Sequence, residues 1–187
     1  MKRLIKDRKG LSTVVTTLII LVVAILLATV VTFYAINVTT TRVQEESLQI
    51  YKQHIWHNGT TYAEAAFIVI NTGGRDLVID KIAVRGQESA WSTVYYNKTT
   101  NAISADLTYI TPLTNGSLVG KNSTIGGTDY PLTQASNDLI LKSGWSMIVY
   151  ITNPDSISVS DIGVTVGFTA FTSNAQYYKE TNVQASV

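Results

Sequence analysis

Residues 11–36 read LSTVVTTLIILVVAILLATVVTFYAI, a stretch of apolar and hydroxylated side chains without a single charge. The uncharged run extends further at both ends, from Gly10 to Thr41. As an α-helix, residues 11–36 would be about 39 Å long, which exceeds the ~30 Å of hydrocarbon in a bilayer. The stretch is therefore predicted to be a membrane-length helix.

The ten residues before this stretch, MKRLIKDRKG, are strongly basic. They hold five bases and one acid, namely Lys2, Arg3, Lys6, Arg8 and Lys9 against Asp7. Because positive charge beside an apolar helix favours the cytoplasmic side of a membrane, this end is expected to stay in the cytoplasm. The remainder of the chain would then be exported.

Two interpretations compete for the apolar stretch: an ordinary signal peptide or anchor, and an assembly helix that the mature protein keeps. A secretory signal has an apolar core of about 7–15 residues followed by a small-residue cleavage site. The run here is far longer, and no A-x-A site follows it. The candidate processing site lies instead before the run, at Lys9, Gly10 and Leu11.

With its basic leader, a Lys-Gly junction and an uncharged helix directly behind, the N-terminus resembles the archaeal type IV pilins and their class III signal peptide. The resemblance implies cleavage between Gly10 and Leu11 by a membrane prepilin peptidase, so that the helix stays with the mature chain. Bacterial type IV pilins usually carry Glu at the fifth mature position, and this chain has Val15 there. The departure agrees with the archaeal branch, which lacks this acid.

Small side chains gather on one face of the predicted helix, within about 100° of arc at 100° per residue. They are Thr13, Thr17, Ala24, Ala28, Thr32 and Ala35. Helices in an apolar medium associate by close packing at small residues. The face suits helix bundling, although small residues are common in any membrane helix.

An apolar stripe, of which Ile36, Val43 and Ile50 are members, predicts that the helix continues in amphipathic form to about His57. Asn58-Gly59 then supplies a left-handed stop. The chain would thus divide into a leader (1–10), a long assembly or transmembrane helix (11–57) and an exported domain (58–187).

Strand signals dominate the exported domain. Runs at 65–70 and 77–84 flank Asn71-Thr72-Gly73-Gly74 and predict a hairpin. Further strands are expected at 91–96, 107–110, 138–141, 145–151 and 162–171, and residues 112–136 are expected to be mostly loop. Together these predict an α+β chain: a long N-terminal α-helix followed by a C-terminal antiparallel β-sandwich, which resembles archaeal pilins and archaellins more loosely than the N-terminus does.

Composition argues against several classes of function. The 187 residues contain 14 Lys and Arg, 13 Asp and Glu, and no Cys, so no disulfide or thiolate metal site is expected. Loss of the leader would leave more acids than bases, and no basic surface for nucleic acid is evident.

Catalytic and metal sites are likewise not predicted. His54 and His57 are the only histidines, and they have no third ligand type clustered with them in the sequence, so a polar pair at a wet helix end is the preferred interpretation. Carboxylates are dispersed, and neither a phosphate loop nor a nucleophile motif occurs. We expect neither an enzyme nor a bound cofactor.

Five Asn-x-Ser/Thr sequons are present. Asn58, Asn97, Asn115 and Asn122 fall in expected turns or loops and are candidate glycosylation sites. Asn37 lies on the predicted helix, where a glycan would crowd a bundle. We expect glycans on the loop sites and not on Asn37.

The resemblance implies the major structural subunit of a pilus-like surface filament that serves adhesion or cell contact. The subunit would wait in the cytoplasmic membrane and then polymerise with copies of itself, aided by a prepilin peptidase, an assembly ATPase and a membrane platform protein. The alternatives are an archaellin of the swimming filament, a minor pilin, and a membrane-anchored exported binding domain that never polymerises.

Overall fold

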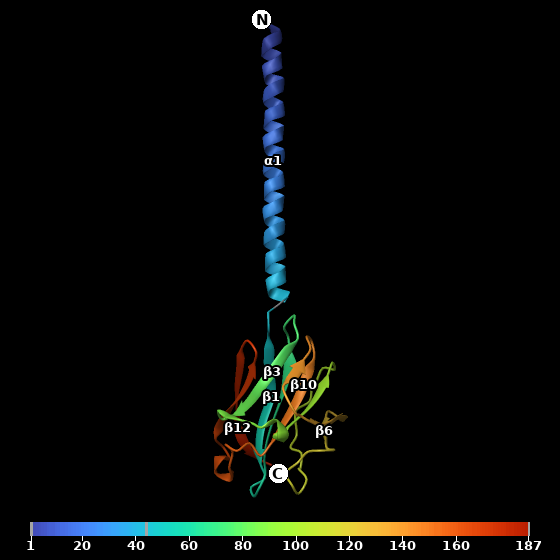
Figure 1. Cartoon of the computed structure of the whole chain (residues 1–187), viewed down its shortest axis with the longest axis vertical. Coiled ribbons are helices and arrows are strands. Elements are labelled where there is room, and N and C mark those ends of the chain that lie inside the picture. Colours follow the sequence, from blue (N-terminus) through green and yellow to red (C-terminus); the bar gives the residue numbers. More distant parts are fainter. Residues whose placement is uncertain (1, 44, 187) are drawn as a thin grey trace. The chain divides into compact units, whose positions relative to one another are not determined.

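The computed structural model describes residues 2–43 and 45–186. The side chains of residues 2–10, 42 and 43 are not described. Two compact units are present, and the division between them follows Val43. The first is the helix α1 (Lys2–Val43), and the second, from residue 45 onward, is called the β-unit (Figure 1).

The helix is shorter at its C-terminal end than the sequence predicted. It continues through Thr39-Thr40-Thr41 and ends at Val43, whereas residues Leu48–His57 form the strand β1. The predicted amphipathic extension to His57 is therefore wrong, and so is a domain boundary at residue 58. The physical reason is pairing: β1 lies in an antiparallel ladder beside β2 (Ala63–Asn71), from Leu48 opposite Asn71 to His57 opposite Ala63.

A bulge in β1 interrupts the alternation of inward-facing and outward-facing side chains, so the sequence alone does not show the strand. The register with β2 shifts between Tyr51 and His54, and Lys52 has a left-handed φ of 52°. Before the bulge Leu48 and Ile50 are buried, and after it Ile55 is buried. One extra residue reverses the phase of inward and outward side chains, so apolar positions in the linear sequence resemble a helical stripe.

Residues 45–186 of the β-unit contain twelve strands, where the sequence predicted about seven. After β1 and β2 come β3 (Leu77–Val84), β4 (Gln87–Glu88), β5 (Val94–Thr99), β6 (Asn122–Ile125), β7 (Thr128–Pro131), β8 (Thr133–Gln134), β9 (Leu139–Leu141), β10 (Ser146–Thr152), β11 (Thr165–Thr172) and β12 (Gln176–Ala185). Short 3-10 helices lie at η1 (Trp91–Thr93) and η2 (Val159–Asp161). The order in the main sheet is β4-β3-β11-β12-β1-β2-β10-β5-β8, with β9 beside β3 and a separate β6-β7 hairpin.

The main sheet is mostly antiparallel and curls on itself as a half-barrel. Its single parallel pairing among the described strands joins β1 to β12, from Ile55 opposite Val183 to His57 opposite Ala185. Strands from both halves of the main sheet, β4 to β12 and β1 to β8 in the order above, contribute to one apolar core. In this core Phe67 of β2 contacts Phe168 of β11, with ring centroids 5.0 Å apart. The α+β class is confirmed, while a two-layered sandwich stays a prediction.

The predicted hairpin at Asn71-Thr72-Gly73-Gly74 is wrong, although both strands exist. β2 pairs with β1 and β10, whereas β3 pairs with β11, β4 and β9. The turn carries the chain from one half of the curled sheet to the other. Local turn chemistry marks where a strand ends, but it does not select the partner of the next strand.

Other segments also differ from the sequence-based expectation. Residues 107–110 form no strand, the expected loop at 112–136 contains β6, β7 and β8, and β12 was not predicted at all. The last predicted strand, 162–171, is confirmed from Thr165 onward as β11 (Thr165–Thr172), where Val166, Phe168 and Ala170 are buried in alternation. A second apolar cluster, which includes Ile68, Tyr150 and Leu107, lies where the segment between β5 and β6 covers the outer face of β2 and β10.

Candidate functional site: an exposed apolar helix

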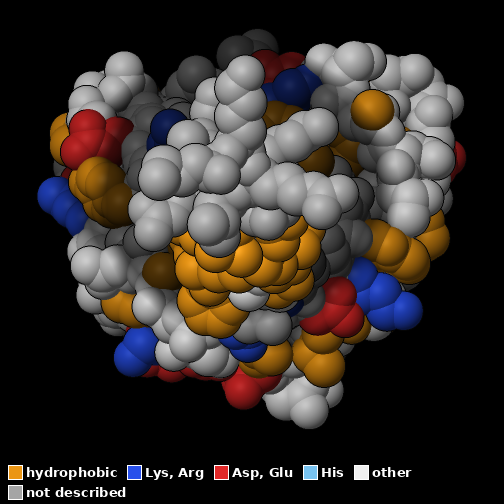
Figure 2. All heavy atoms as spheres, turned by 90° about the horizontal axis from the view of Figure 1, so that it is seen from above, with side chains coloured by type: hydrophobic (Ala, Val, Ile, Leu, Met, Phe, Trp, Pro, Cys, Tyr) orange, Lys and Arg blue, Asp and Glu red, His pale blue; other side chains and the backbone are white. Residues whose placement is uncertain are grey.

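The main candidate for a functional feature is the apolar surface of α1. Residues Leu11–Thr41 form a 31-residue stretch that is exposed along its whole length, and its most apolar 18 residues have a mean hydropathy of 3.1. Seen along its axis, the helix carries hydrophobic side chains around its circumference (Figure 2). It is long and apolar enough to act as a signal anchor or a membrane span, which is compatible with membrane insertion.

Several threonine hydroxyl groups of this helix have partners inside it. Those of Thr16, Thr17, Thr29, Thr32 and Thr41 each donate to a backbone carbonyl three or four residues earlier, at donor–acceptor distances of 2.7–2.9 Å. Thr40 divides its bond between the carbonyls of Ile36 and Asn37. A polar group with an internal partner can enter an apolar medium without the cost of an unmet hydrogen bond. These threonines therefore do not oppose burial of the helix in lipid or in a bundle of helices.

The predicted small-residue face lies within this uninterrupted helix. Because no break occurs between Lys2 and Val43, the helical period places the predicted packing residues on one side. They are Thr13, Thr17, Ala24, Ala28 and Ala35, together with Thr32. The hydroxyl of Thr32 bonds the carbonyl of Ala28, so it turns toward the backbone. The face stays a predicted packing surface.

The predicted processing site also lies in α1. Lys9, Gly10 and Leu11 all have helical backbone. The side chain of Lys9 is not described, whereas Leu11 is exposed. Cleavage between Gly10 and Leu11 stays a prediction.

A group of contacts that sequence inspection missed fixes the first residues of the β-unit. The carboxylate of Glu46 accepts hydrogen bonds from the Thr172 hydroxyl and, at 2.8 Å, from Asn174 Nδ2. The carbonyl of Ser47 accepts the backbone amides of Thr72 (2.9 Å) and Gly73 (3.1 Å). We call this cluster the collar, because it ties the residues just past α1 to two separate turns of the sheet.

The four candidate glycosylation sites lie in different settings. Asn115 is exposed in a turn, and Asn58 is half-buried in the turn between β1 and β2, where its Oδ1 accepts the amides of Thr60, Thr61 and Tyr62. Asn122 begins β6 and is exposed. Asn97 lies within β5, not in a loop, and its Nδ2 donates to the carbonyl of Pro131 at 2.7 Å. Asn37 is exposed on α1.

The two histidines lie in β1 and not at a helix end, which corrects their predicted setting. His54 Nε2 is 2.9 Å from Asp106 Oδ1, and its ring stacks on Trp56 with centroids 5.0 Å apart. His57 is buried, and its Nδ1 accepts the amide of Gly59. Among the described residues, no three His, Cys, Asp or Glu side chains come together as a metal site.

An unusual buried carboxyl was also missed. Glu64 of β2 is only 1% exposed, and its burial raises the pKa to about 8, although the hydrogen bond from the Ile110 amide acts in the opposite direction. The only signal in the sequence is one acid inside the apolar run 63–70. Such an acid is ordinarily assigned to the solvent side of a strand.

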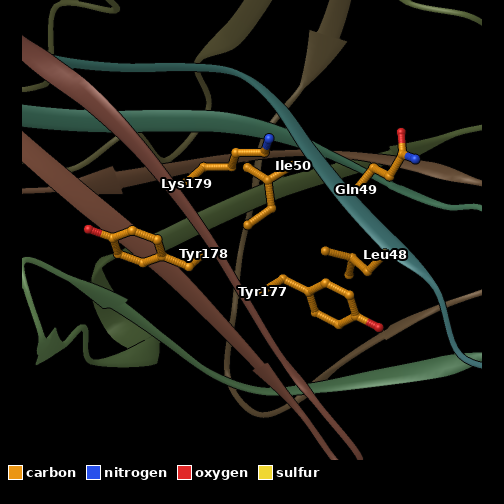
Figure 3. A pocket seen from close by; sticks show the side chains of 6 residues that line it. All are labelled: Leu48, Gln49, Ile50, Tyr177, Tyr178 and Lys179. Carbon is orange, nitrogen blue, oxygen red and sulfur yellow. The ribbon is translucent and has the colours of Figure 1, made fainter.

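A shallow cleft opens where β1 and β12 separate. Their parallel pairing covers only the last residues of β1, and near its start the two strands diverge around a cavity of about 300 Å³. It is lined by Leu48, Gln49, Ile50, Tyr177, Tyr178 and Lys179, of which Leu48 and the ring of Tyr177 lie close together (Figure 3). Leu48 and Ile50 are buried, so little apolar surface is offered there.

Comparison with known proteins adds no assignment. No protein-family model and no curated protein matches the chain. Among solved structures it is similar to the apo PCuAC domain of PmoF2, with 13% identity over 76% of this chain and 95% of that one and a TM-score of 0.41. It is also similar to the copper-bound PCuAC domain of PmoF2 (12% identity, 75% of this chain and 98% of that one, TM-score 0.33) and to a β-glucosidase of Erythrobacter marinus (11% identity, 74% and 15%, TM-score 0.27). Similarity at this level carries no conclusion about function.

Proposed function

We propose that this chain is the major structural subunit of an archaeal type IV pilus-like extracellular filament that polymerises through α1. The observation that carries the proposal is the helix itself. Residues Leu11–Thr41 are apolar, contain no charge and are unburied within the chain, while the β-unit has its own core. A surface of this kind needs an apolar partner along its whole length.

The energetics favour direct transfer from one apolar environment to another. Each large apolar side chain gains about 1.5–3 kcal/mol on leaving water, so a helix released from lipid into solvent would be strongly disfavoured. Helices of neighbouring subunits provide an alternative dry environment. The small-residue face that includes Ala24 and Ala28 would let those helices approach closely.

In this proposal the β-unit coats the filament and forms a two-layered β-sandwich at its surface. Its turns, together with any glycans on Asn58, Asn97, Asn115 or Asn122, would meet the medium and other cells. The precursor would wait in the cytoplasmic membrane, and a prepilin peptidase, an assembly ATPase and a platform protein would act on it. The filament would serve adhesion or cell contact.

Substitution on the two sides of α1 tests the proposal. Ala28→Leu adds bulk to the small face, and Val30→Leu adds bulk about 150° away around the helix. In cells that export the chain, the first variant is expected to lower the yield of sheared filaments by roughly tenfold or more, because close helix contacts are lost. The second is expected to leave the yield unchanged.

Extraction of membranes with alkaline carbonate provides the control, because it measures how much of each variant is inserted in the membrane. Both variants should insert equally. Equal filament yields from the two variants would contradict packing through the small face.

A further inference from the structure

A segment without helix or strand lies over the outer face of the sheet. Residues 103–114, which we call the strap, run between β5 and β6. Ile103 and Leu107 are buried in the apolar cluster beneath it, which also contains Trp56 and Tyr150. The strap therefore seals an apolar sheet face against solvent.

Side chains of the sheet and of its first turn hold the strap down through its backbone. Lys52 Nζ donates to the carbonyls of Ser104 and Ala105, the Tyr150 hydroxyl donates to Thr108 at 3.0 Å, and the Tyr62 hydroxyl donates to Thr114 at 2.5 Å. His54 contacts Asp106, as described above. Glu64 completes the set, because its Oε1 accepts the amide of Ile110 at 2.9 Å.

Glu64 differs from the other fastening groups in its burial. The residue lies near the end of an inner strand of the sheet, with Trp56 of β1 and Thr152 of β10 as its cross-strand neighbours. Its Oε2 is buried and has no hydrogen-bond partner among the described residues. An ionised carboxylate here would have one amide donor and one bare oxygen, which is costly in a dry interior.

The groups that face Glu64 do not offset this cost. Tyr109 of the strap is half-buried and Tyr150 of β10 is buried, and the pKa of each phenol is raised, first by desolvation and further by the charge of Glu64. Neither Tyr62 nor Asp106 supplies a positive charge that would stabilise the ionised carboxylate of Glu64. The two basic groups nearby, Lys52 and His54, are engaged with the strap carbonyls and with Asp106.

We propose that the strap is a proton-gated flap, which lies closed on the sheet while Glu64 carries its proton and opens increasingly as that carboxyl ionises. Opening would give the carboxylate access to water and would expose the apolar face around Trp56. This property is independent of whether the chain forms filaments.

Thermodynamic linkage gives the pH range. The pKa of Glu64 is about 8 in the closed form against an ordinary value of 4.5, so the proton stabilises the closed form fully below about 4.5. Between these two pH values, the equilibrium constant for closing falls by up to about tenfold per pH unit. The stabilisation is lost above about pH 8. The contact between His54 and Asp106 also fastens the strap, and a separate variant must measure its contribution.

Hydrogen exchange of the full chain in detergent tests the flap. Protection factors, corrected for the intrinsic chemical rate, are compared at pH 5 and pH 8 for peptides from the strap and from β11. In the unmodified chain, strap protection should fall by about thirtyfold or more while β11 stays constant. Glu64→Gln keeps the shape and the bond to Ile110 but cannot ionise, so its strap protection should vary by less than about threefold.

Asp106→Asn is the matched control, because it removes the histidine pair and leaves Glu64 in place. Its strap should retain most of the pH dependence. Equal pH dependence in Glu64→Gln and in the unmodified chain would overturn the proposal, as would a strap that stays equally protected at both pH values. A parallel fall in β11 would also overturn it, because the change would then be global unfolding.

Discussion

The backbone amide of Gly73 donates a hydrogen bond of 3.1 Å to the carbonyl of Ser47, so the turn after β2 closes directly on the first residues of the β-unit. The approach is tight, since a Cβ on Gly73 would lie 2.6 Å from the carbonyl oxygen of Glu45 and 2.7 Å from the amide nitrogen of Ser47. Glycine is required here for space and not for its backbone angles.

Replacement of Gly73 by Ala is expected to destabilise the β-unit by about 1–3 kcal/mol, because two backbone atoms must move. Gly167→Ala is the comparison: the three atoms nearest to its Cβ all belong to the side chain of Tyr178, which is exposed and can swing away, so the cost should be smaller. Urea unfolding in detergent, followed by tryptophan fluorescence, measures both free energies. All three tryptophans, Trp56, Trp91 and Trp145, lie in the β-unit. A larger loss for Gly167→Ala would contradict this explanation.

The collar predicts a difference between two adjacent acids. Glu46→Ala removes the partner of Thr172 and Asn174 and should lower the free energy of unfolding of the β-unit by about 1–2 kcal/mol. Glu45 is exposed, and Glu45→Ala should change the free energy of unfolding of the β-unit by less than about 0.5 kcal/mol. The same urea titration reports both values. Equal effects of the two variants would argue against the collar.

The contact between Phe67 and Phe168 predicts coupling between strands that are not paired in the sheet. A double-mutant cycle with leucine at both positions should give a coupling energy of about 0.5–1.5 kcal/mol, which is typical of an aromatic pair. Phe171 lies on the opposite face of β11 from Phe168, and its cycle with Phe67 should give no coupling. If the cycle of Phe67 and Phe168 gave no coupling energy, the result would contradict a curled sheet that brings β2 and β11 together.

Acid should loosen the segment around η2. The pKa of Asp161 is lowered from 3.8 to about 2 by hydrogen bonds from the hydroxyl and amide of Ser158 and then by Arg85, whose guanidinium lies 2.8 Å away. The stabilisation is therefore present above pH 3.8 and is lost as the pH falls toward 2. Hydrogen exchange of residues 158–164 should increase across this range. Asp161→Asn should remove this acid response, and an unchanged response in that variant would exclude Asp161 as its source.

Long-range contacts explain which parts of the fold could be predicted from the sequence. The helix was predictable because charge is absent from Gly10 to Thr41, and such a run is informative by itself. β1 was not, because the bulge at Lys52 shifts the phase of its apolar residues and leaves an apparent helical stripe. The partners of β2 and β3 depend on the curl of the sheet, which the turn between them does not encode.

The candidate sites divide in the same way. The helix surface follows from composition, so Ala28 and its neighbours could be placed on one face in advance. Glu46 and Glu64 gain their roles from Asn174 and Ile110, which are 128 and 46 residues away in the chain. Without the fold, each is an ordinary acid.

The most direct test of the central claim is to shear the cells that produce this chain and to examine the released material by electron microscopy and N-terminal sequencing. The proposal predicts filaments whose subunit begins at Leu11 and retains the whole apolar helix. A released form that begins downstream of Ile36, or a chain that remains a monomer in the membrane fraction, would contradict it.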